Sequence, residues 1–114
     1  MTAITEAQNV YVGHDNVIQI TLTENDVDYN LDTENVTKIK LDFGAFEVDS
    51  VANPTAIFWS GTILSLRLGN VTAVVDLADN NRSASSRLIV YTASNPNGVV
   101  WLDPLKFKIK HPSV

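Results

Sequence analysis

The stretch VIQITLTENDVDYNL, residues 17–31, holds the clearest strand pattern and the clearest turn signal of the 114-residue chain. Apolar and polar side chains alternate along its first half, which places Ile18, Ile20 and Leu22 on one face. Such alternation is typical of a β-strand with one face on a core and the other in water. The following residues 24–26 carry side chains that tolerate tight turns. We therefore predict a strand, a turn and a returning strand.

The acidic segment from Glu24 to Asn35 admits a second interpretation, as a calcium-binding loop. The ligand positions of a helix–loop–helix calcium site would fall on Asp26, Asp28, Asn30, Asp32 and Glu34. However, Leu31 stands where such a loop needs glycine, and Thr37 stands where it needs a bidentate glutamate. The flanking segments are also strand-like. We therefore predict a hairpin whose acids face water and whose Leu31 enters the core, and no metal site.

The alternation of the first strand recurs elsewhere in the chain. The strongest further strands are predicted at residues 37–43 (Ile39, Leu41 and Phe43 inward), 63–68 (Leu64, Leu66 and Leu68 inward) and 105–110 (Leu105, Phe107 and Ile109 inward). Weaker strands are predicted at residues 10–12, 27–29, 46–51, 56–59, 85–92 and 99–102. Asp103-Pro104 is predicted to be a turn. Residues 71–81 fit a strand, a short helix or a loop.

Composition and strand number together predict one all-β domain. Many short strands separated by turn signals indicate a β-sandwich or barrel. The domain is expected to span residues 9–112, after a flexible tail at residues 1–8. The net charge of −5 argues against nucleic acid as a partner. The chain has no cysteine for disulfides or thiol chemistry. Its start does not resemble a signal peptide, and no run is long and apolar enough for a membrane helix.

Several segments resemble the small immunoglobulin-like domains in virion proteins of tailed bacteriophages. The resemblance lies in residues 11–16, 18–31, 36–41 with Gly44, and 87–101. Shared features are a "G-D" turn opening, a strand ending in an acidic hairpin, and a strand closed by glycine. Residues 79–86 depart from the tight glycine-initiated entry expected before the next strand. The resemblance implies an immunoglobulin-like β-sandwich of about seven to nine mostly antiparallel strands.

The same resemblance implies a non-enzymatic structural or accessory protein, made in the host cytoplasm and then part of the virion. It carries no catalytic residues and implies no cofactor. Its partners would be other virion proteins or further copies of the chain. A carbohydrate-binding or host-recognition module is the alternative, because flat tryptophans on a sheet stack on sugars. Trp59 and Trp101 are the candidates for a surface glycan, although each lies in an apolar cluster that favours the core.

A candidate interface follows from the strand at residues 85–92, which is apolar on both faces. Leu88 and Val90 share one face, and Ile89 and Tyr91 share the other. A sandwich strand has one wet face, so either a loop or a partner subunit covers the second apolar face. The candidate contact consists of Ile89, Tyr91 and Trp101, with Lys106, Lys108 and Lys110 as a charged flank. These lysines either protect an edge strand from aggregation or meet the acidic hairpin of a neighbour.

Other groups with chemical potential have simpler interpretations. Glu47 and Asp49 lie two apart on a predicted strand, at a spacing that overlaps that of paired glycosidase carboxylates. We expect both to face water, because Val48 and Val51 point inward. His14 lies in a predicted turn, and His111 lies near the far end of the chain. A metal site at either histidine would have only carboxylates as further ligands, so neither is predicted to be functional.

Overall fold

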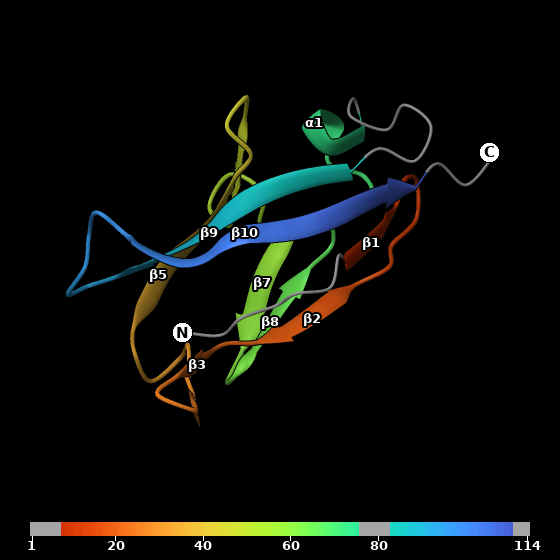
Figure 1. Cartoon of the computed structure of the whole chain (residues 1–114). Helices are drawn as coiled ribbons and strands as arrows, with labels where there is room; N and C mark the ends of the chain where they lie inside the picture. The colour runs from red at the N-terminus through yellow and green to blue at the C-terminus, as the bar shows by residue number, and fades with distance from the viewer. Residues whose placement is uncertain (1–7, 76–82, 111–114) are drawn as a thin grey trace.

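The computed structural model describes residues 8–75 and 83–110 (Figure 1). The elements in these residues are, in chain order, β1 (Gln8–Tyr11), β2 (Ile18–Thr21), β3 (Thr23–Glu24), β4 (Val27–Asp28), β5 (Val36–Asp42), β6 (Glu47–Asp49), β7 (Ile57–Ser60), β8 (Ile63–Leu66), α1 (Thr72–Val75), β9 (Ser83–Thr92) and β10 (Val99–Lys110). The prediction of an all-β protein is confirmed. The strands at residues 46–51 and 56–59 are also confirmed, with shorter or shifted ends.

The strands form three sheets. A five-stranded sheet has the order β1-β10-β9-β5-β6, a three-stranded sheet has the order β2-β8-β7, and β3 pairs with β4. Figure 1 shows β9 and β10 crossing above β7, β8 and β2. Strands β1 and β10 are parallel, and the other pairs within the described residues are antiparallel. The chain thus passes repeatedly between the two larger sheets.

The two larger sheets share one hydrophobic core. The inward residues predicted from alternation are buried in it: Ile20, Leu22, Ile39, Leu41, Leu64, Leu66, Leu68, Leu105, Phe107 and Ile109. Ile18 and Phe43, also predicted to point inward, are partly buried and pack against the same cluster. Burial of these side chains supplies the main favourable free energy of folding, since it removes apolar surface from water.

The prediction of a turn at Asp103-Pro104 is wrong. Strand β10 continues through these residues, and its register against β9 shifts between Val100 and Leu102 and again between Leu102 and Leu105. Proline has no N–H for a β-ladder, so a strand accommodates it where such an irregularity interrupts the pairing. The two strands predicted at residues 99–102 and 105–110 are therefore one.

The structure also changes the start of the first strand and defines part of the segment at residues 71–81. Gln8 does not belong to the tail, because it lies opposite Phe107 in the parallel β1–β10 pair. Of the open segment at residues 71–81, the first part is the short helix α1 with Val74 buried in the core. The later part of that segment lies outside the described residues, as do most of the tail and residues 111–114.

The acidic hairpin is confirmed. Thr23 lies opposite Asp28, and Glu24 opposite Val27, while Asn25 and Asp26 have φ angles of 53° and 63°. Two consecutive positive φ angles are characteristic of a type I′ turn, whose twist matches that of the two strands. Leu31 enters the core as predicted, with 0% of its surface exposed.

The hairpin turn offers a test of this backbone conformation. Asp26→Gly should raise the free energy of unfolding by a few tenths to about 1 kcal/mol, because glycine adopts the left-handed region without a steric cost. Asp26→Ala removes the same carboxylate but keeps a Cβ, so it should not stabilise the protein. Urea unfolding of both variants measures the difference. Equal effects of the two substitutions would show that charge, and not backbone conformation, limits stability here.

Candidate interaction surface

The outer face of the five-stranded sheet carries the candidate contact. Ile89 and Tyr91 lie on this face and are half-buried, whereas the alternate residues Leu88 and Val90 are buried in the core. The register places Val100 of β10 opposite Ile89, and Val100 is 40% exposed. Ile89, Tyr91 and Val100 therefore form one apolar patch across two neighbouring strands. We call these three residues the outer apolar patch.

The β9–β10 turn partly covers the outer apolar patch. Gly98 has a φ angle of +83°, and a Cβ there would lie 2.6 Å from Cγ2 of Ile89 and 2.8 Å from Cε2 of Tyr91. Glycine thus meets two needs, a left-handed backbone and a close approach to these side chains. A loop or a partner subunit was expected to cover this apolar face, and the loop that contains Gly98 covers part of it. The exposed Val100 remains beside it.

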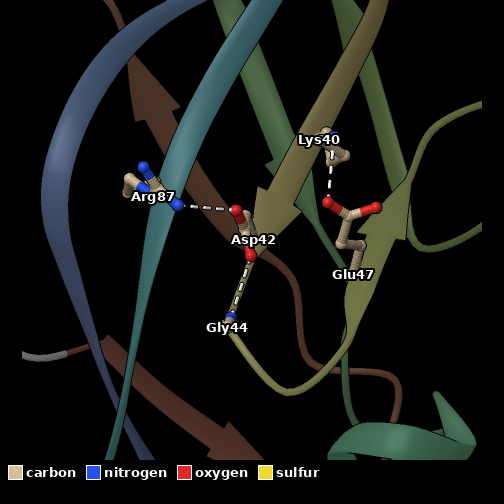
Figure 2. A network of polar contacts seen from close by, with 5 residues as sticks. All are labelled: Lys40, Asp42, Gly44, Glu47 and Arg87. Atoms are coloured by element: carbon tan, nitrogen blue, oxygen red, sulfur yellow. Dashed lines mark hydrogen bonds and ion pairs between the residues drawn. The ribbon is translucent and has the colours of Figure 1, made fainter.

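Lysine side chains border the patch on β5. Lys38 lies opposite Tyr91 in the register, and its Nζ is 4.3 Å from the centre of the Tyr91 ring. The Nζ of Lys40 lies 5.6 Å from the same ring and 3.0 Å from Oε2 of Glu47 (Figure 2). A cation this close to an aromatic ring is attracted by the ring's quadrupole. The Tyr91 ring is therefore held between two positive charges and the Gly98 turn.

The environment of Lys40 affects its ionisation. Interaction with the Tyr91 side chain, and next with Glu47, raises the pKa of Lys40 from 10.5 to about 12. A raised pKa means that the folded state favours the charged amine. The contribution of this group to stability is therefore fully present below pH 10.5 and is lost as the pH rises towards 12. At neutral pH Lys40 is a fixed positive charge on this face.

The carboxylates nearby have local structural partners. Asp42 accepts hydrogen bonds from Nη2 of Arg87 at 3.0 Å and from the backbone N–H of Gly44 at 2.9 Å (Figure 2). Asp49 accepts hydrogen bonds from the backbone N–H groups of Val51 and Ala52, at 2.9 and 2.8 Å. Asp42 thus links β5 to β9 and its own turn, while Asp49 shapes the turn after β6.

This arrangement explains the acid pair at Glu47 and Asp49. Glu47 is exposed and forms its ion pair with Lys40, which lies diagonally across from it on the neighbouring strand β5. Asp49, expected to face water, is half-buried, and its carboxylate accepts hydrogen bonds from the following turn. Val51 lies in that turn and is 70% exposed, so the expectation that it points inward is wrong. The two acids therefore have different structural roles.

Trp101 does not join the outer apolar patch, which corrects its assignment to the candidate contact. Its side chain is buried, 5% exposed, and its ring centre lies 4.5 Å from that of Tyr29 on the inner side of the sheet. Adjacent residues of a strand point to opposite faces, so Val100 occupies the outer position instead. This burial also removes Trp101 as a surface for stacking sugars.

The three lysines of the predicted flank lie along β10, on its outer side. Lys106 lies opposite Ser85 and Lys108 opposite Ser83, and both lysines are exposed. Lys110 is half-buried, with its Nζ 5.9 Å from the ring of Tyr11. The idea that they protect an edge strand is wrong for Lys108 and Lys110, because residues 107–110 of β10 pair with β1, on the side of the strand away from β9. Lys106 precedes the pairing with β1. The three lysines form a basic extension of the patch.

Trp59 lies elsewhere, at the edge of the three-stranded sheet. It is half-buried and lines a shallow pocket of about 280 Å³ together with Thr37, Ser50, Val51, Pro54, Ile57 and Phe58. Trp59 also packs against the hydrophobic core, while aromatic side chains beside a few polar groups are a common lining of small-ligand pockets. Of the two tryptophans, Trp59 is therefore the one whose position still suits a glycan.

The two histidines are the remaining candidates. His14 is exposed in the turn after β1, where the neighbouring Asp15 accepts a hydrogen bond from Nδ2 of Asn70 at 3.1 Å. His111 lies outside the described residues. Within residues 8–75 and 83–110, no three histidine, aspartate or glutamate side chains gather as ligands for a metal ion. No helix in the described part of the chain has the length and apolar character to cross a membrane.

Sequence reasoning missed Lys38, Lys40 and Val100 as members of this surface. The alternation at residues 37–43 did place the two lysines on the outer side of their strand. What it lacked was the pairing of β5 with β9, which brings residues 38 and 91 together. For Val100, the missing information was the pairing of β10 with β9. This pairing places Val99 opposite the inward-facing Val90 and Val100 opposite the outward-facing Ile89.

Comparisons of the chain with protein-family models, with curated proteins and with solved structures each find no match.

Proposed function

We propose that the chain is an immunoglobulin-like β-sandwich that serves as a non-enzymatic structural or accessory component of a bacteriophage particle and acts through protein–protein contacts. The strand order supports the fold. In immunoglobulin domains of the variable type, strands C′, C, F and G share one sheet, and B, E and D belong to the other. Strands β6, β5, β9 and β10 have the first order, and β2, β8 and β7 have the second.

Two features distinguish the chain from constant-type antibody domains. The first strand β1 joins the five-stranded sheet and runs parallel to the last strand, whereas strand A of constant-type domains extends the sheet of B, E and D. The chain also has no cysteine for the disulfide that links the two sheets of antibody domains. Aliphatic residues such as Ile20 and Leu88 fill the core between the sheets instead.

The outer apolar patch carries the proposal of a contact function. A half-buried tyrosine, flanked by aliphatic side chains and bordered by lysines, has the composition of a binding hot spot with a polar rim. The assignment to a phage particle is supported by the resemblance of residues 11–16, 18–31, 36–41 with Gly44, and 87–101 to virion domains.

Replacing the patch tests the contact function. Ile89→Ser with Tyr91→Ser should reduce incorporation of the chain into particles at least about tenfold, because a hot spot contributes 2 kcal/mol or more. Immunoblotting and immunogold microscopy of purified particles measure incorporation, and circular dichroism verifies the fold. The matched control is Val17→Ser with Ile63→Ser, which replaces two exposed apolar residues outside the patch. Normal incorporation of the folded patch variant would overturn the proposal.

Carbohydrate binding is the second candidate function, and the position of Trp59 favours it. A glycan that stacks on this side chain would shift the tryptophan fluorescence of the protein. Trp59→Ala should abolish both the shift and retention on a glycan array, while a Lys106→Ala control should retain them. Absence of binding to any arrayed glycan would remove this candidate.

A further inference from the structure

The β3–β4 hairpin presents an exposed apolar side chain within an acidic frame. Val27 is 67% exposed, and Glu24, Asp26 and Asp28 surround it in sequence and register. The hairpin forms its own two-stranded sheet and projects at the lower edge of the molecule in Figure 1. Its type I′ turn fixes the conformation before any contact is made, which lowers the entropic cost of binding.

The outer apolar patch has the opposite charge around a similar apolar centre. Lys38 borders Tyr91, and Lys106 and Lys108 extend from Val100 along β10. No carboxylate among residues 8–75 and 83–110 forms an ion pair with these three lysines. Patch and hairpin are therefore complementary in two respects: each offers an apolar centre, and their charged surroundings have opposite sign.

This complementarity is not satisfied within one chain. Tyr29 follows β4 directly and packs on Trp101, which lies on the inner side of β10. Val100 and the rest of the patch lie on the outer side. The hairpin of each chain is thus held on the opposite side of the sheet from its own patch. Any contact between the two surfaces joins different copies.

The charges also decide how two copies would meet. Pairing two patches face to face would bring the lysines of one copy against those of the other, and like charges at an interface cost several kcal/mol. Pairing two hairpins would oppose their acids in the same way. The favourable arrangement places the hairpin of one copy on the patch of the next. Such a contact between two different surfaces is heterologous, and it can repeat from copy to copy.

We propose that the outer apolar patch binds the β3–β4 hairpin of a second copy of this chain, so that copies assemble head to tail into a ring or a filament. Val27 docks against Tyr91 and Val100, while Asp26 and Asp28 approach Lys38, which lies opposite Tyr91 in the register. This inference rests on the proposed contact function and names the partner as the chain itself.

Two variants of the full chain test the arrangement. The hairpin variant carries Val27→Ser and Asp28→Lys, and the patch variant carries Ile89→Ser and Lys38→Glu. Sedimentation velocity from about 1 μM to about 1 mM covers the affinities of weak and moderate contacts. Wild-type protein should form species larger than dimers, which dissociate with added salt because charged contacts are screened. Each variant alone should be monomeric, whereas Val17→Ser, at an exposed apolar residue outside the patch, the hairpin and the Trp59 pocket, should behave as wild type.

The mixture of the two variants is the decisive sample. The hairpin variant keeps an intact patch and the patch variant keeps an intact hairpin, so an equimolar mixture has one functional contact and should stop at the dimer. A monomeric wild-type protein at all concentrations would overturn the inference, and so would a mixture that stays monomeric. If the inference fails but incorporation into particles still depends on Ile89 and Tyr91, the proposed contact function stands, and the partner is a protein other than this chain.

Discussion

Phe107→Ala is expected to lower the free energy of unfolding by about 3–5 kcal/mol, the range for removing a buried phenylalanine. Phe107 has 0% of its surface exposed and lies in the middle of the five-stranded sheet, opposite Gln8 on β1 and Ala84 on β9. Its ring centre is 5.8 Å from that of Phe43. The substitution removes the transfer free energy of the ring and leaves a cavity that the flanking strands close only in part.

Urea unfolding followed by circular dichroism measures this loss. Natural domains have a total stability of only about 5–15 kcal/mol, so the variant should unfold at a much lower urea concentration. Lys108→Ala is the matched control, because residue 108 is the next in the same strand and is exposed on the other face. A surface substitution of this kind changes stability by about 0.5 kcal/mol or less. Equal losses in both variants would contradict the assignment of Phe107 to the core.

The success at Phe107 and the failure at Trp101 have one physical cause. The segment at residues 105–110 alternates between apolar and lysine side chains, so its period of two identifies the inward face without ambiguity. Residues 99–102 are apolar at every position, so the same period fits either face. Only the packing of Trp101 on Tyr29 decides which neighbour points inward. Local pattern therefore predicts a strand's faces only where the two faces differ in polarity.

Strand neighbours depend on pairing between distant residues, which local pattern does not contain. The tight turn after Glu24 was predictable because hairpin pairing joins residues close in sequence. The pairing of Gln8 with Phe107 joins the two ends of the domain, and it shows that the last part of β10, residues 107–110, is not an edge. In the same way, Ile89 and Tyr91 were identified from their own strand, whereas Lys38 reaches Tyr91 through the pairing of β5 with β9.

Gly69→Ala is expected to destabilise the protein by about 3 kcal/mol, at the upper end of the range for overpacking. A Cβ at residue 69 would meet the backbone oxygen of Tyr11 at 2.5 Å, and that of His14 closer still. Backbone atoms cannot rotate away as the end of a side chain can. The turn between β1 and β2 would have to move, which would break the hydrogen bond from Gly13 N–H to the Gly69 carbonyl at 2.9 Å.

Gly61→Ala separates this clash from the general cost of replacing a glycine. Gly61 has a φ angle of +60° and open space around the added methyl group. The control should therefore lose only the free energy that alanine needs to adopt a left-handed backbone, about 1–2 kcal/mol. Amide hydrogen exchange supplies a second measurement. Exchange at Gly13 should accelerate in Gly69→Ala beyond the loss of global stability, because its acceptor moves, and should not do so in Gly61→Ala. If the Gly69→Ala variant is stable and the amide of Gly13 is still fully protected from exchange, the backbone of the β1–β2 turn does not clash with a Cβ at residue 69.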